Sequence, residues 1–143
     1  MVSAFGIRVI VRSDDTALVR IHGELDAFTA TAFRAGLEEA SLHRNVVVDL
    51  SEIRFISAGA IGILIGCTTR ASGQRFAVAA PLDSWVRRVM ALCAYPYPIA
   101  ESLDDGLRAL GLPYRRLPRA SVGPGREVSR GRRGLGVRHA GLR

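Results

Sequence analysis

Apolar and polar residues alternate along the chain in a way that predicts short strands and helices. Residues 7–12 read IRVIVR and residues 16–22 read TALVRIH, two alternating runs rich in β-branched side chains. The Ser-Asp-Asp sequence between them favours a tight turn, so we expect the two strands to form a hairpin. After residues 23–26, apolar side chains recur at helical spacing and predict a helix. Its expected apolar stripe consists of Phe28, Ala32, Phe33 and Leu37.

The centre of the chain predicts a buried strand followed by an apolar helix. Residues 46–50 read VVVDL, a nearly continuous apolar run that is typical of a strand buried on both faces of a parallel sheet. Ser57 is a good N-cap residue for a helix that we expect to run to about Arg70. Residues 76–80, FAVAA, predict the next buried strand.

A further helix is expected after this strand. We expect it to start at Pro81 and Asp83 and to end before residues 95–98, YPYP, because each proline disfavours helix in the residue before it. Its expected apolar face is formed by Trp85, Val86, Val89, Met90 and Leu92.

Residues 99–100 predict a short last strand, and Ser102 would cap a helix over residues 103–110. The complete order is then β-β-α-β-α-β-α-β-α. Strands that alternate with helices in this way predict an α/β fold, with one mixed, mostly parallel sheet of about five strands and about four helices.

The composition changes sharply after the last predicted helix. Residues 1–112 carry eleven Arg and twelve Asp or Glu, whereas residues 113–143 carry nine Arg and a single acid, Glu127. The net charge of +7 therefore comes from the second part, which is rich in Gly and lacks apolar periodicity. We expect one folded domain over residues 5–112 and a disordered, basic C-terminal tail over residues 113–143.

Side chains that catalyse reactions or bind metals are not grouped along the chain. Cys67 and Cys93 do not form a CxxC pair. His22, His43 and His139 are scattered, with no spacing that suggests a metal site. Walker-type loops and nucleophile elbows are also absent from the sequence. We therefore expect no enzyme activity, no metal and no cofactor.

The protein is expected to be soluble and cytoplasmic, with no membrane contact. The first residues do not have the pattern of a signal peptide. The most apolar run, residues 55–67, has thirteen residues and is too short to cross a hydrocarbon core of roughly 30 Å. The two cysteines outside any disulfide framework favour a reducing compartment.

Two motifs carry a resemblance to a known family. Residues 46–66 read VVVDLSEIRFISAGAIGILIG: a buried strand, Asp-Leu-Ser, a spacer, an aromatic residue, a serine-containing turn and a glycine-bearing apolar helix. Upstream, GELD at residues 23–26 is followed by TATAF at residues 29–33. At this spacing the motifs resemble the STAS domain of anti-sigma factor antagonists, over about residues 5–112. The resemblance implies a protein-binding module whose partner is a kinase-like anti-sigma factor, so that binding releases a sigma factor.

The resemblance also implies where phosphorylation would occur. In these antagonists the partner kinase phosphorylates a serine at the start of the helix, where unpaired N–H groups can host a phosphate. Aligning Phe55 with the family's aromatic residue puts Ala58 at the acceptor position, and Ala58 has no hydroxyl. Ser57 is an alternative acceptor, although its Oγ is better suited to cap the N–H of Gly59 or Ala60. The usual switch is therefore in question.

The expected partner-binding surface combines residues from both motifs. It consists of Asp26, Arg54, Ser57, Ala58 and Gly59. For Asp26 we also consider a structural role as a helix-start cap. Asp49 is expected to order the loop toward Ser57. Gly62 and Gly66 each cost the helix roughly 1 kcal/mol relative to Ala, and we expect close packing of the helix on the sheet to offset that cost.

Two alternative functions stay open at the level of the sequence. One is a scaffold subunit of a signalling assembly, which cannot be phosphorylated and binds other STAS proteins. The other is binding of nucleic acid or another acidic partner through the Arg-rich tail. Tyr114 is the only aromatic residue of the tail, which argues against base stacking and hence against nucleic acid.

Overall fold

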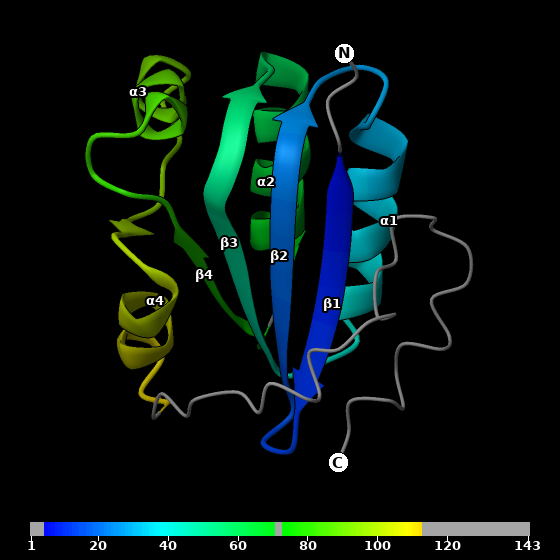
Figure 1. The fold of residues 1–143 in the computed structure, drawn as a ribbon. Coiled ribbons are helices and arrows are strands. Elements are labelled where there is room, and N and C mark those ends of the chain that lie inside the picture. Colours follow the sequence, from blue (N-terminus) through cyan, green and yellow to red (C-terminus); the bar gives the residue numbers. More distant parts are fainter. Residues whose placement is uncertain (1–4, 71–72, 113–143) are drawn as a thin grey trace.

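The chain folds into alternating strands and helices around one sheet. The computed structural model describes residues 5–70 and 73–112 (Figure 1). The elements are β1 (Gly6–Arg12), β2 (Thr16–Leu25), α1 (Ala30–Ala40), β3 (Asn45–Ile56), α2 (Ala58–Arg70), β4 (Arg75–Ala79), α3 (Trp85–Leu92), β5 (Ile99–Ala100) and α4 (Leu103–Ala109). The five strands lie in the order β1-β2-β3-β4-β5, antiparallel between β1 and β2 and parallel elsewhere. The predicted α/β fold and mixed sheet are confirmed, whereas the predicted tail lies outside the described residues.

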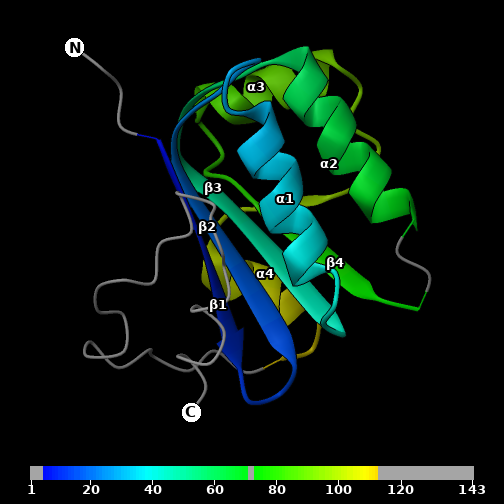
Figure 2. The same ribbon diagram turned by 90° about the vertical axis from the view of Figure 1, so that its right-hand side faces the viewer.

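The helices cover the two faces of the sheet unequally. On one face α1 and α2 lie side by side (Figure 2) and, with α3, enclose the larger core. Its fully buried members include Phe33, Leu37, Val48, Leu64 and Met90. On the opposite face, Leu107 of α4 packs on Leu18 and Val47 in a smaller core. Because α4 lies mainly over β3, β4 and β5, part of β1 and β2 on that face has no described helix over it (Figure 1).

β3 is longer than the sequence predicted. It has twelve residues and continues after Asp49 through a segment of mixed polar and apolar residues, because it stays paired with β2 across two register shifts. Asp49 therefore lies in the middle of β3. Its carboxylate is 3.3 Å from the guanidinium of Arg20 and accepts hydrogen bonds from Ser51. The predicted role of Asp49 in ordering the loop toward Ser57 is wrong.

Serine side chains start the last two helices. Ser102 caps α4, as predicted. The cap of α3 is Ser84, whose Oγ accepts the amide N–H of Arg87 at 3.2 Å. The start predicted at Pro81 and Asp83 is therefore too early, because the capping oxygen that satisfies the first turn comes after both residues.

The glycines of α2 do not have the packing role that we expected. Gly62 is exposed, and a Cβ built at Gly62 or Gly66 would meet no heavy atom of another part of the chain within 4 Å. Close packing of the helix on the sheet requires neither glycine, so that interpretation is wrong. In α1, by contrast, a Cβ at Gly36 would collide with Cδ1 of the buried Ile7.

The sheet ends on a very short strand. β5 pairs only Ile99 and Ala100 with Val78 and Ala79 of β4. Residues 75–77 of β4 therefore have no described strand on their outer side. This edge lies at the end of the sheet farthest from β1.

Candidate functional site

The start of α2 is exposed at the carboxyl end of β3. Ala58 and Gly59 are exposed and Ser57 is half-buried. The Oγ of Ser57 accepts the amide N–H of Ala60 at 3.1 Å, which confirms the predicted capping role. The amide N–H of Ser57 donates to the carbonyl oxygen of Leu25 at 2.8 Å and joins the helix start to the end of β2.

The loop after β2 is organised by Asp26. Its Oδ1 accepts the amide N–H groups of Phe28 at 2.9 Å and Thr29 at 3.1 Å. The hydroxyl of Thr29 in turn donates to the carbonyl oxygen of Glu24 at 2.8 Å and accepts the amide N–H of Asp26 at 2.9 Å. These bonds support the structural role considered for Asp26, and they fix the loop beside the start of α2.

The five residues expected at the partner surface lie close to the carboxyl ends of β2 and β3. Asp26 directly follows β2, and Arg54 is an exposed residue near the end of β3. The carboxyl ends of parallel neighbours meet at the same edge of a sheet, where α/β proteins commonly bind their ligands. The fold therefore brings both sequence motifs to one edge.

Sequence reasoning missed three exposed aromatic side chains at this edge. Phe28 is 94% exposed, Trp85 is 54% exposed and Phe55 is 41% exposed. They lie, respectively, in the loop after β2, at the first residue of α3 and near the end of β3. The prediction that Phe28 and Trp85 belong to buried helical stripes is wrong: Phe28 precedes α1, and Trp85, the first residue of α3, is more than half exposed. Exposed aromatic side chains are common anchors of protein–protein interfaces.

The histidines have separate surroundings. Nδ1 of His43 is 2.8 Å from Oδ1 of Asp15, and this hydrogen bond lowers the pKa of Asp15 below its usual value. His22 is half-buried on the sheet, and His139 lies outside the described residues. Among the residues that the structure describes, no three His, Cys, Asp or Glu side chains are grouped to hold a metal ion.

The two cysteines are free thiols. Cys67 is buried in the larger core, as expected for a small apolar side chain, and Cys93 is half-buried. Over residues 5–70 and 73–112, none of the helices combines the length and the apolar character needed to cross a bilayer.

The fold is shared with solved regulatory proteins. An anti-sigma factor antagonist from Mycobacterium paratuberculosis is similar over 76% of this chain and 95% of that chain, with 25% sequence identity and a TM-score of 0.69. SpoIIAA, an anti-sigma factor antagonist, in its unphosphorylated form, is similar over 78% of this chain and 100% of that chain, with 18% identity and a TM-score of 0.60. At 18% identity, this second likeness shows the fold alone.

A family model gives the match at the level of sequence. The model described as "Mlab, STAS domain" matches residues 9–94, which is more than half of the chain. The matched segment contains β2, the Asp26 loop, β3 and the whole of α2. The exposed edge built by these elements is thus part of the matched region, and the chain belongs to the STAS domain family, the family of the anti-sigma factor antagonists.

Proposed function

We propose that this chain is a non-catalytic regulatory module that binds an anti-sigma factor. The proposed contact surface is the docking edge, which we define as Asp26, Phe28, Arg54, Phe55, Ser57, Ala58, Gly59 and Trp85. The observation that carries the proposal is the exposed start of α2, with Ala58 and Gly59 open to solvent at the carboxyl edge of the sheet. The solved antagonist from Mycobacterium paratuberculosis supports the choice of partner.

The chemistry of the docking edge suits a protein partner. Aromatic side chains and Arg dominate the binding energy of many protein interfaces, and the docking edge offers Phe28, Phe55, Trp85 and Arg54. From Ala58 as far as Thr69, α2 has no charged side chain, so a partner that covers its first turn removes no charge of this helix from water.

We further propose that binding does not depend on phosphorylation at the start of α2. Ala58 has no hydroxyl, and the hydroxyl of Ser57 accepts the hydrogen bond that caps the helix. A phosphate would add a charge of up to about −2 in the middle of the docking edge. Without an acceptor at position 58, the contact would stay formed in the presence of ATP.

A matched pair of substitutions tests the contact surface. Ala58→Arg places a long charged side chain in the docking edge, whereas Ala35→Arg places it on the exposed surface of α1. We expect Ala58→Arg to weaken binding to the anti-sigma factors of the native cell by at least about tenfold, and Ala35→Arg to leave it unchanged. Equal binding by both variants in a calorimetric titration would show that the partner binds elsewhere.

The absence of a switch is tested by treating the complex with ATP. The wild-type chain should gain no phosphate mass at Ser57 and should keep its partner. Ala58→Ser restores a hydroxyl and should gain one phosphate and release the partner if that partner is a kinase. Phosphate mapped to Ser57 of the wild-type chain would contradict the proposal.

A further inference from the structure

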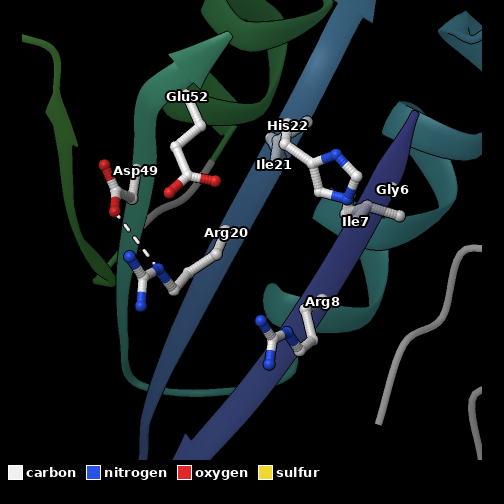
Figure 3. Close-up of a pocket in the computed structure, with 8 residues that line it drawn as sticks. All are labelled: Gly6, Ile7, Arg8, Arg20, Ile21, His22, Asp49 and Glu52. Atoms are coloured by element: carbon white, nitrogen blue, oxygen red, sulfur yellow. Dashed lines mark ion pairs between the residues drawn. The ribbon is translucent and has the colours of Figure 1, made fainter. Parts of the chain in front are cut away.

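The face of the sheet opposite α1 and α2 holds a second polar site, separate from the docking edge. Side chains from β1, β2 and β3 surround a hollow of about 130 Å³ on the part of this face that α4 leaves open (Figure 3). Five polar side chains line it, namely Arg8, Arg20, His22, Asp49 and Glu52. This volume is smaller than that of a pocket for a drug-sized ligand, roughly 300–1,000 Å³, and suits only a small molecule.

Arg8, Arg20 and Asp49 lie next to one another on three neighbouring strands and form a first row of side chains with a net positive charge. Arg8 pairs in register with Arg20, and Arg20 pairs with Asp49 on the next strand. Asp49 is only 4% exposed, and its Oδ2 lies 3.3 Å from Nε of Arg20, so these two charges neutralise each other. Arg8 has no ion-pair partner among the described residues. Because Asp49 neutralises Arg20, the net positive charge of this row is that of Arg8, and an anion beside Arg8 would compensate it.

The second row consists of Gly6, His22 and Glu52, which are also partners in register. The ring of His22 lies over Gly6: a Cβ at Gly6 would be 3.0 Å from Cε1 and closer still to Nε2. The absence of a side chain at Gly6 therefore lets the imidazole lie flat as one wall of the hollow (Figure 3). Glu52 is exposed and, like Arg8, has no ion-pair partner within residues 5–70 and 73–112.

Arg8 and Glu52 thus present opposite charges from the two outer strands of the hollow. β2 lies between them, so their strands are separated by roughly 9–10 Å, twice the spacing of neighbouring strands. Both side chains line the same hollow without forming an ion pair with each other. A ligand complementary to this arrangement carries an anionic and a cationic group a few bonds apart.

We propose that this hollow binds a small zwitterion. Its carboxylate or phosphate group lies against the guanidinium of Arg8, a planar donor suited to oxyanions, and its ammonium group lies against the carboxylate of Glu52. Free amino acids and phosphoethanolamine share this chemistry. The site belongs to the face of the sheet opposite α1 and α2 and does not depend on the function proposed for the docking edge.

Amide chemical shifts of the full chain test the binding. Glycine, L-alanine and phosphoethanolamine are titrated separately, with acetate, phosphate and ethylamine as probes that carry one kind of charge. We expect at least one zwitterion to shift the amide signals of Arg8, Arg20 and Glu52 in a saturable way. An amino acid that binds identifies a carboxylate ligand, and phosphoethanolamine alone identifies a phosphate ligand. No saturable shift up to about 10 mM, a range that includes millimolar affinity, would overturn the proposal. So would a single-charge probe that binds as tightly as the zwitterion.

Charge substitutions separate this site from non-specific binding. Arg8→Gln and Glu52→Gln should each weaken the zwitterion at least about tenfold, while Arg34→Gln on the exposed surface of α1 should not. The single charge reversals, Arg8→Glu and Glu52→Arg, should each abolish binding of the zwitterion. The double variant that carries both reversals offers the same pair of charges in exchanged positions and should regain binding. Binding that survives both single reversals would also refute the assignment. Thermal unfolding of each variant checks that the fold is kept.

Discussion

Replacing Gly62 with Ala should stabilise the protein, although glycines in buried helices are commonly kept for packing. Gly62 lies inside α2, is exposed, and offers open space where a Cβ would be added. The substitution therefore introduces no clash and reduces the conformational freedom of the unfolded chain. The difference in helix propensity between Gly and Ala predicts a gain of about 0.8–1.0 kcal/mol in the free energy of unfolding.

Gly36 of α1 supplies the matched control. Here the added methyl group would collide with Cδ1 of Ile7, which is 1% exposed and cannot move away into solvent. Overpacking of this kind costs about 1–3 kcal/mol, enough to cancel or exceed the gain in helix propensity. Urea denaturation followed by circular dichroism should therefore rank Gly62→Ala above the wild type and Gly36→Ala at or below it. Suppose that Gly62→Ala lowers the free energy of unfolding while its dependence on urea concentration is unchanged. This result would refute the conclusion that the side of α2 that carries Gly62 has open space for a methyl group.

Three further predictions concern individual side chains. The hydrogen bond from His43 lowers the pKa of Asp15 and stabilises the fold above the usual pKa of 3.8. This stabilisation is lost as the pH falls through the lower pKa of the folded state. In the variant Asp15→Asn, the free energy of unfolding should therefore fall less steeply with decreasing pH in this acid range. Burial raises the pKa of Tyr95 to about 12, so stability should fall between pH 10 and 12, where only the unfolded phenol ionises, and Tyr95→Phe should remove this loss in alkaline unfolding experiments. Ser84→Ala removes the bond to the amide N–H of Arg87 and should cost about 1 kcal/mol in a urea titration.

The mixed sheet and the order of helices and strands along the chain could be predicted because the interior strands are recognisable from their apolar composition. Residues 46–50 and 76–80 are short apolar runs between helical segments, and such runs fit only a sheet that is covered on both faces. The length of β3 could not be predicted in the same way. Its second half mixes polar and apolar residues and is partly exposed. It is a strand because β2 beside it continues with bulges, which is a property of the pair.

Which side of α2 packs on the sheet could not be predicted from the sequence, for a different physical reason. The helix has apolar or small residues at almost every position before Thr68, so no polar stripe marks its outer side. Glycines on such a helix are equally compatible with a packed face and an open face. The exposure of Phe28 could not be predicted because α1 begins only at Ala30, and a small shift in a helix start moves a side chain out of the helix. Trp85 lies in the first turn of α3, where the helical pattern alone does not tell a buried side chain from an exposed one.

The hollow on the face of the sheet opposite α1 and α2 could not be predicted from the sequence either. Arg8, Arg20 and Asp49 are far apart in the chain, and each is an ordinary charged position in a strand. Only the register of three strands places them in one row. The signal that sequence reasoning could have used is the alternation itself, which puts Arg8 and Arg20 on the face opposite the neighbouring core residues.

The brevity of β5 has a consequence for how molecules of this protein behave toward one another. A long, flat and apolar strand edge invites the edge strand of another molecule to pair with it and begin an aggregate. Among the described residues, β4 lacks a strand on its outer side only over residues 75–77. This segment begins with the exposed charge of Arg75, and the exposed Pro98 immediately precedes β5. Short length, charge and proline are the features by which natural sheets discourage such pairing, so the sheet can end in solvent without a partner chain to close it.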